Sequence, residues 1–178
     1  MLDEFKEDLA RYRAELHSVF HEPSIVVVFF YRFRTGLYPK LPRLVALPIK
    51  LLVEPLYFLL TLLFGIHLPK GARIGGGLMI FHTGGIVLHH QAVLGRNCTL
   101  RHNVTIGVRH GGGDVPVLGD NVNIGTGAVI LGAIRIGDNT VIGANAVVLC
   151  DVPDGCMAVG NPARILARKS TSQAPGAA

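Results

Sequence analysis

The chain has 178 residues, of which 49% are hydrophobic and 16% are charged. This balance excludes a chain that is disordered over most of its length, and the length suffices for one or two small units with a buried core. The net charge of +5 comes from scattered Lys and Arg residues with few aromatic residues among them. Such a pattern disfavours nucleic-acid binding and fits a phosphate-bearing ligand.

The cysteines and the N-terminal residues indicate where in the cell the protein is located. Cys98, Cys150 and Cys156 form no C-x-x-C pair, so neither a disulfide framework nor a zinc ribbon is expected. The first residues, MLDEFKEDLARYR, are charged and lack the early apolar stretch of a signal peptide. We therefore expect a cytoplasmic location.

Residues 1–66 are predicted to be helical. Apolar residues three and four positions apart form one stripe near the N-terminus, and they are Leu2, Phe5, Leu9, Tyr12, Leu16 and Val19. Pro23 is expected to end this helix, and Ser24 is expected to cap a second helix that runs through Arg34.

A third apolar segment, residues 44–64, is long enough to cross a bilayer, which takes about 20 apolar residues. It also contains Pro48, Pro55, Lys50 and Glu54, and the last two are spaced to pair on one helix face. We predict an amphipathic helix packed on other helices or on a partner subunit. The alternative is a helix on a membrane surface, which would attach the protein peripherally to the inner face of the membrane. A true span is disfavoured.

From residue 68 the sequence repeats every six residues. The period has a two-residue shift around Ile86 and one degraded segment before residue 118. The aliphatic positions are Leu68, Ile74, Ile80, Ile86, Leu88, Leu94, Leu100, Ile106, Leu118, Ile124, Ile130, Ile136, Ile142 and Val148. A period of six is typical of a β-helix, in which three hexapeptides form one triangular coil. An α-helix is excluded because every sixth residue would drift around its surface.

Two further positions of the repeat agree with this prediction. Four residues after the aliphatic position lies a second inward candidate, usually small: Ala72, Cys98, Val122, Ala128, Thr140 and Ala146. Directly after many aliphatic positions lies a glycine, which we expect to allow the corner: Gly75, Gly95, Gly107, Gly119, Gly125, Gly137 and Gly143.

The chain is accordingly divided into a helical region, residues 1–66, and a β-helix domain, residues 67–168. The segment 108–117, VRHGGGDVPV, breaks the repeat and is predicted to be a functional loop that leaves the coil. The small and polar tail, residues 169–178, is expected to be disordered.

Two histidines share one position of the repeat. His82 and His102 each follow an aliphatic residue by two positions, and they are separated by one coil plus the two-residue shift. We expect their side chains to stack on one face of adjacent coils, about 4.8 Å apart along the axis.

Long stretches of the β-helix domain resemble a known family. ARIGGGLMIFHTGGIVLHHQAVLGRNCTLRHNVTIG, GGGDVPVLGDNVNIGTGAVILGAIRIGDNTVIGANAVVLCDVP and AVGNPARIL are similar to the serine acetyltransferase family of hexapeptide transferases over about residues 64–168. TLRHNVTIG looks most similar to the branch associated with exopolysaccharide (colanic-acid-type) acetylation. The resemblance implies a mainly β fold: a left-handed parallel β-helix preceded by helices. It also implies a homotrimer with active sites between subunits, open to pairing as a dimer of trimers.

The activity that the resemblance implies is O-acetyl transfer from acetyl-CoA, with no metal. It assigns His82 as the general base that takes the proton of an acceptor hydroxyl. Transfer is expected to be direct, since the sequence has no G-x-S-x-G motif for a serine nucleophile. His102 replaces a Gln of the serine enzymes; it orients His82, binds the acceptor or assists the base, and a structural role is equally open.

The resemblance also assigns the acetyl-CoA positions. The pantetheine arm is placed against Gly107, Val108, Gly125, Thr126 and Ala144. In the closing motif GNPAR, Arg164 is the candidate for a phosphate contact, because a guanidinium suits phosphate; a solvated charge is the alternative.

Three departures from the family pattern bear on the acceptor. Phe81 stands where the serine enzymes have an acid before the catalytic His, and His67 stands where they have an Asp. Val115 replaces a second catalytic His before Pro116, and His110, at a different position in the loop, is a candidate to substitute for it. A carboxylate would orient the base, and His67 does so less well. An amino-acid acceptor also needs a carboxylate for its ammonium group, so the loss of the acid beside His82 favours a neutral sugar hydroxyl.

The predicted acceptor is therefore a sugar of an exopolysaccharide or its precursor, with L-serine as the alternative. A remote alternative is a trimeric zinc-dependent hydro-lyase with His82, His102 and His110 as ligands. A non-catalytic scaffold that binds no CoA is the third class.

Overall fold

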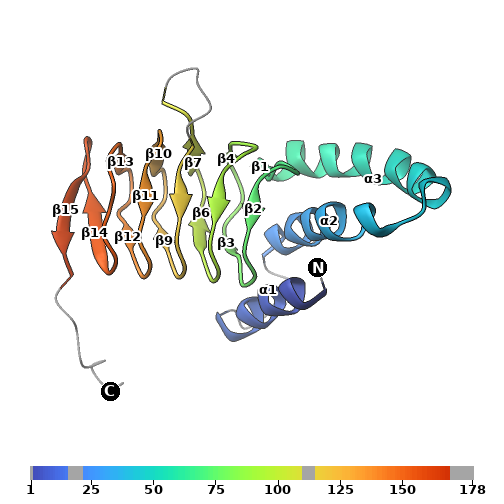
Figure 1. The fold of residues 1–178 in the computed structure, drawn as a ribbon, viewed down its shortest axis with the longest axis horizontal. Helices are drawn as coiled ribbons and strands as arrows, with labels where there is room; N and C mark the ends of the chain where they lie inside the picture. Colours follow the sequence, from blue (N-terminus) through green and yellow to red (C-terminus); the bar gives the residue numbers. More distant parts are fainter. Residues whose placement is uncertain (1, 16–21, 110–114, 169–178) are drawn as a thin grey trace.

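The computed structural model describes residues 2–15, 22–109 and 115–168 (Figure 1). Leu16, Val19, His110 and the tail 169–178, all subjects of the predictions above, lie outside the described residues. The helical part comprises α1 (Leu2–Glu15), α2 (Ser24–Gly36), the 3₁₀ helix η2 (Tyr38–Lys40) and α3 (Arg43–Phe64).

Short strands make up the rest of the chain. In chain order they are β1 (Ile66–His67), β2 (Arg73–Ile74), β3 (Met79–Phe81), β4 (Ile86–Leu88), β5 (Val93–Leu94), β6 (Thr99–Arg101), β7 (Thr105–Gly107), β8 (Val117–Leu118), β9 (Asn123–Ile124), β10 (Val129–Leu131), β11 (Arg135–Ile136), β12 (Val141–Ile142), β13 (Val147–Val148), β14 (Cys156–Val159) and β15 (Arg164–Ala167).

The strands form three sheets that the chain visits in turn. Sheet A has the order β1-β4-β7-β10-β13, sheet B the order β11-β8-β5-β2, and sheet C the order β15-β14-β12-β9-β6-β3. All pairs are parallel except β14 with β15, which is antiparallel. The predicted fold class, a left-handed parallel β-helix of hexapeptide repeats preceded by helices, is confirmed (Figure 1).

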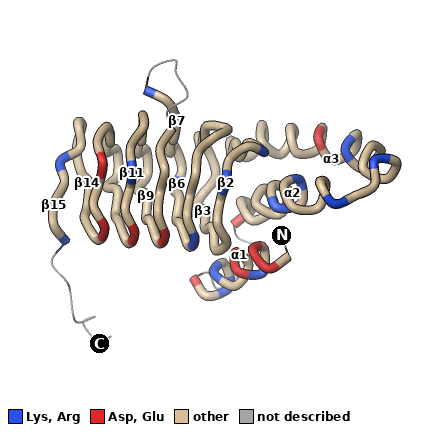
Figure 2. The backbone as a smooth tube through the Cα atoms, viewed as in Figure 1, with Lys and Arg blue, Asp and Glu red and all other residues tan. Residues whose placement is uncertain are grey.

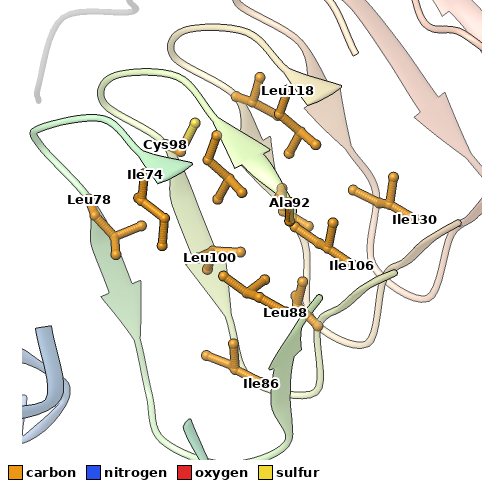
Figure 3. Close-up of a cluster of buried hydrophobic side chains, with 14 of the residues drawn as sticks. Ile74, Leu78, Ile86, Leu88, Ala92, Cys98, Leu100, Ile106, Leu118 and Ile130 are labelled. Carbon is orange, nitrogen blue, oxygen red and sulfur yellow. The ribbon is translucent and has the colours of Figure 1, made fainter. Parts of the chain in front are cut away.

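The six-residue period places its residues inside the coil as predicted. Every aliphatic position from Leu68 to Val148 is buried, and so is every small position from Ala72 to Ala146. Figure 3 shows several of these side chains, among them Ile74, Leu100 and Ile130, directed into the interior from successive coils. Removing so much apolar surface from water is the main stabilising contribution, at about 25 cal/mol per Å².

The glycines after the aliphatic positions have a different role from the predicted one. Left-handed corner residues are mostly asparagines three positions after the aliphatic residue, such as Asn97 and Asn121, both with φ of 56°. Gly125 is not left-handed, but an added Cβ there would lie 2.6 Å from the backbone nitrogen of Ala144. None of these glycines is left-handed, so the prediction that they form the corners was wrong. All of them except Gly107 let the coils approach one another.

Tyr12 and Ser24 attach the helices to the first coil. The Tyr12 hydroxyl lies 2.9 Å from Oγ of Ser24 and accepts the N–H of Ile80, and Ser24 Oγ donates to the Ile80 carbonyl (2.8 Å). Ser24 therefore does not cap α2 as predicted; Pro23 is the N-cap residue, without a side-chain cap. The buried hydroxyl of Ser24 instead donates a hydrogen bond to the carbonyl of Ile80 in β3.

A buried ion pair makes a second attachment. Arg32 Nε donates to Asp8 Oδ2 (2.9 Å) and Nη2 donates to Asp8 Oδ1 (3.1 Å), and both side chains are almost fully buried. Asp8 Oδ1 also accepts the N–H of Leu78 (2.7 Å), and Arg32 donates to the carbonyls of Ile74 and Gly75. α1, α2 and the first coil are thereby held together by one network.

α3 packs against α2 and the first coil on one side only, as predicted for an amphipathic helix. Within it Val53 and Tyr57 are buried, whereas the large apolar residues on the other side are exposed. Glu54 pairs with Arg34 and Lys70 rather than with Lys50. In the described part of the chain, α3 is the one helix long and apolar enough to cross a membrane by length and composition.

Candidate active site

The corner between sheets C and A collects most of the predicted site residues; we call it the C–A corner. Strand register aligns Ile80 with Leu100, and Ile124 with Ile142, in successive coils of sheet C. The residues two positions after these four form a column along the corner: His82, His102, Thr126 and Ala144.

The two histidine rings are neighbours in this column. Their centroids are 5.8 Å apart with an interplanar angle of 63°, an edge-to-face arrangement. The predicted proximity is confirmed, and the separation exceeds one coil spacing because the rings do not lie parallel. The His82 side chain is 67% exposed, whereas Nδ1 of His102 is buried with no hydrogen-bond partner among the described residues.

The backbone of His82 is left-handed, with φ of 64°. Such a conformation is uncommon for a residue with a side chain and costs about 1–3 kcal/mol. Other coils place the left-handed residue one position later, for example at Asn103. Strain of this kind is often found at functional sites, so it marks His82 independently of its side chain.

Glu22 holds His82 in this conformation. Glu22 Oε2 accepts the backbone N–H of His82 (3.1 Å), and Oε1 lies 3.5 Å from His82 Nδ1. The Glu22 carboxylate is itself nearly buried. Its position beside Nδ1 leaves Nε2 of the exposed ring free to take a proton, which is the arrangement of a general base oriented by an acid.

Glu22 is the functional residue that the sequence analysis missed. It precedes His82 by 60 residues, and no motif connects the two. The expectation that an acid beside the base is missing, drawn from Phe81 and His67, was therefore wrong. One sequence signal was available: Glu22 is the only acidic residue between Glu15 and Glu54. A lone carboxylate in an apolar and basic segment needs a partner when it is buried.

The surroundings of Glu22 are rigid. Ser24, two residues later, is fixed by Tyr12 and by the Ile80 carbonyl. Burial raises the pKa of Tyr12 to about 12, so this phenol keeps its proton and stays a donor at neutral pH. The start of α2 therefore cannot shift easily relative to β3, which ends next to His82.

The predicted acetyl-CoA positions fall in three places. Gly125, Thr126 and Ala144 lie on the C–A corner with the histidines, where the backbone N–H of Asn145 donates to the Thr126 carbonyl (2.8 Å). Gly107 and Val108 lie at the end of β7, on the corner between sheets A and B. Each strand of sheet A runs from the C–A corner to the corner between sheets A and B. Within one chain the two groups of residues are therefore separated by the length of these strands.

Arg164 lies at the far end of sheet C from His82. Sheet C runs from β3 to β15 over five strand intervals, which is about 24 Å at 4.8 Å each. Arg164 pairs with Val159 and lines an open cavity of about 440 Å³ together with residues 159–163. An elongated ligand is needed to contact both Arg164 and the histidine pair.

The remaining candidates lie apart from this centre. His67 is exposed on β1, opposite Val87, and Glu22 rather than His67 is the group beside His82 Nδ1. Phe81 packs under the guanidinium of Arg101 (5.6 Å). Among the described residues, no group of three or more His, Cys, Asp or Glu side chains is placed to hold a metal ion.

Replacing Glu22 by glutamine is expected to lower kcat at least about tenfold, which corresponds to about 1.4 kcal/mol. A charge pair at this distance is worth roughly 1–4 kcal/mol between water and a protein surface, and it would stabilise the protonated ring of a general base. Glu15→Gln, which removes the charge from an exposed pair with Arg11, is the matched control. Equal kcat in the two variants would exclude Glu22 from orienting the base.

Comparisons with known proteins agree with this fold. A model of the bacterial transferase hexapeptide family (six repeats) matches residues 116–150. The chain is 45% identical to a protein of Oryza sativa subsp. japonica named probable serine acetyltransferase 1, over 64% of this chain and 38% of that protein. It is 38% identical to the serine acetyltransferase of Synechococcus elongatus, over 64% of this chain and 48% of that protein. It spans less than half the length of either relative.

Two solved structures match most of the chain. The serine acetyltransferase of Neisseria gonorrhoeae is 33% identical with a TM-score of 0.78, over 96% of this chain and 67% of that one. The apoenzyme of soybean serine acetyltransferase is also 33% identical, with a TM-score of 0.76 over 92% of this chain and 68% of that one. Each match covers more than nine-tenths of the chain and therefore includes both its helices and its coils.

Proposed function

Because the chain belongs to the serine acetyltransferase family of hexapeptide-repeat proteins, we propose that it transfers the acetyl group of acetyl-CoA to an acceptor hydroxyl. The observation that carries this proposal is the exposed His82 ring with Nδ1 beside the buried carboxylate of Glu22. This pair supplies a base that needs no metal and no covalent acyl-enzyme.

The proposed chemistry is one displacement. Acetyl-CoA supplies a thioester carbonyl that is already activated. His82 Nε2 removes the hydroxyl proton while the hydroxyl oxygen forms a bond to the carbonyl carbon. The bond from that carbon to sulfur breaks, and His82 returns the proton to the leaving thiolate. Glu22 stabilises the ring while it carries the extra proton.

L-serine is the acceptor that the relatives favour, because both curated proteins and both structures are named for it. Phe81 counted against L-serine because it replaces an acid of the serine enzymes. The carboxylate of Glu22 beside His82 removes part of this objection. A sugar hydroxyl, such as that of an exopolysaccharide, is the second candidate. It is favoured by Phe81 and Val115, which replace an acid and a histidine of the serine enzymes.

The residues present fit an elongated acyl donor. Small residues along the C–A corner, Thr126, Ala144 and then Gly160, leave the backbone accessible, and Arg164 offers a cation beyond them. Arg164→Ala is expected to weaken binding of CoA but not of dephospho-CoA, and an equal loss for both would exclude the phosphate contact.

A homotrimer would complete the site. Gly107 and Val108 lie on a different corner from His82, so one chain alone does not bring them together. A cyclic assembly in which the A–B corner of one subunit faces the C–A corner of the next would join the two groups. Sedimentation of the intact protein would distinguish a trimer from a pair of trimers.

Thiol release from acetyl-CoA, measured with and without L-serine, tests the proposal. We expect CoA release that depends on serine and saturates with it. CoA binding without a response to serine would still support an acetyltransferase and would favour a sugar hydroxyl as the acceptor. Absence of CoA binding altogether would contradict the proposed function and favour a scaffold.

A further inference from the structure

The outer side of α3 carries a continuous apolar surface. On the opposite side, the Tyr57 hydroxyl donates to the Leu68 carbonyl (2.8 Å), and Val53 is buried. The large apolar residues of the outer side are 39–91% exposed, and the most exposed are Leu44, Leu51, Leu52, Phe58, Leu62 and Leu63. We call this surface the apolar face of α3. Figure 1 shows α3 extending beyond the end of the β-helix, with α2 on one side of it.

No polar side chain interrupts the apolar face. Apart from the buried Tyr57, the polar residues of α3 are Arg43, Lys50, Glu54 and Thr61. They are seven, four and seven residues apart, and at 3.6 residues per turn this spacing puts them in one narrow strip along the helix. The helix is therefore divided into a packed side, a polar strip and the apolar face.

The charges bordering the apolar face are cations. Glu54 is the only acid between residues 24 and 64, and Arg34 (2.8 Å) and Lys70 already bind it. Lys40, Arg43 and Lys50 are exposed, and none of them forms an ion pair within the described residues. Figure 2 shows basic residues gathered where α3 begins, and the rest of the helix is nearly free of charge.

This charge pattern is a poor match for a second copy of the chain. A two-fold interface between identical subunits brings the same surface together from both sides, so its rim needs charges of both signs to pair. Here the border offers only unpaired cations, and the single acid is occupied. A surface of anionic phospholipid complements both the apolar face and its cationic border.

A span across the bilayer conflicts with the contacts of α3. Glu54 bonds Arg34 of α2 and Lys70 of the first coil, and Tyr57 bonds Leu68. The guanidinium of Arg34 also lies 3.7 Å from the Tyr57 ring centroid. Moving α3 into a membrane interior would break this network and leave its polar groups without partners.

We propose that α3 docks the protein on a membrane surface containing anionic phospholipid, with the apolar face in the interface and Lys40, Arg43 and Lys50 at the headgroups. This docking does not depend on which hydroxyl accepts the acetyl group. It would place the β-helix, and the C–A corner with it, next to the membrane.

Vesicle flotation of the full chain tests the proposal, with phosphatidylcholine vesicles compared with vesicles that also contain phosphatidylglycerol. We expect binding to the anionic vesicles that weakens at high salt. Leu51→Gln with Leu62→Gln should reduce the partition coefficient about tenfold or more per leucine. Leu2→Gln with Leu166→Gln, which removes two exposed leucines elsewhere, is the matched control and should bind as the unaltered chain does.

The cations give a second readout. Changing Lys40, Arg43 and Lys50 to glutamine should cost about fivefold in binding per residue on anionic vesicles, and nothing on neutral ones. Equal binding to both vesicle types would overturn the proposal. So would failure to bind vesicles together with self-association that Leu51→Gln and Leu62→Gln abolish, because a second copy then covers the face. Retention in the membrane after alkaline carbonate extraction would overturn it in favour of a span.

Discussion

Replacing His82 by alanine is expected to lower kcat for acetyl transfer by about 10²–10⁴-fold, the usual contribution of a general base. The exposed ring, with Nδ1 beside Glu22 and Nε2 free, has no equivalent on the C–A corner other than His102. CoA binding and the oligomeric state should be unchanged, because the His82 side chain is mostly exposed. Steady-state kinetics together with CoA titration separate these effects.

His82→Asn is the sharper variant. The His82 backbone is left-handed, and asparagine adopts that conformation far more readily than alanine does. The asparagine variant therefore removes the base while it keeps the corner intact. Loss of turnover in both variants supports proton removal by the ring. Activity retained in the asparagine variant alone would show that the backbone at this corner matters and that another group is the base.

Replacing Asp8 by alanine is expected to lower the free energy of unfolding by about 3–5 kcal/mol, because it leaves the buried cation of Arg32 and the N–H of Leu78 without their partner. Urea unfolding at one fixed protein concentration measures this loss. Asp3→Ala, on the same helix but exposed, should change the value by less than about 0.5 kcal/mol.

A double variant separates charge burial from packing. Asp8→Ala combined with Arg32→Met removes both charges, so it should recover part of the lost stability. A double variant no more stable than Asp8→Ala would mean that the bonds of Arg32 to the Ile74 and Gly75 carbonyls are the main contribution. Unfolding of Asp8→Ala at the urea concentration of the unaltered chain would contradict the proposed role of the network.

The β-helix could be predicted from sequence because its signal is periodic and local. Each buried aliphatic position recurs at a fixed spacing, so the coil register of His82 and His102 follows by counting. The partnership of Glu22 with His82 could not be predicted in this way. It depends on how α2 lies against β3, which tertiary contacts such as that of Ser24 with Ile80 decide.

The role of the glycines is a second feature that could not be predicted from the sequence. Gly125 and its equivalents follow the six-residue period, so their positions could be predicted, but their structural role could not. Sequence spacing does not reveal that the next coil passes within 2.6 Å of where a Cβ would lie at Gly125.

The exposure of α3 could not be predicted from the sequence either. The spacing of apolar residues indicates which faces of a helix are apolar, but not which of those faces is covered by other parts of the protein.

The reversal of direction at the C-terminal end of sheet C has a consequence for solubility. A stack of parallel coils ends in open strand edges, which can template indefinite end-to-end polymerisation. Here β15 runs antiparallel to β14, with Val159 opposite Arg164, so an incoming first coil finds a strand of the wrong polarity. At the other end α1 and α2 lie against β3. Both edges of sheet C are thereby covered, so coils cannot stack end to end through this sheet.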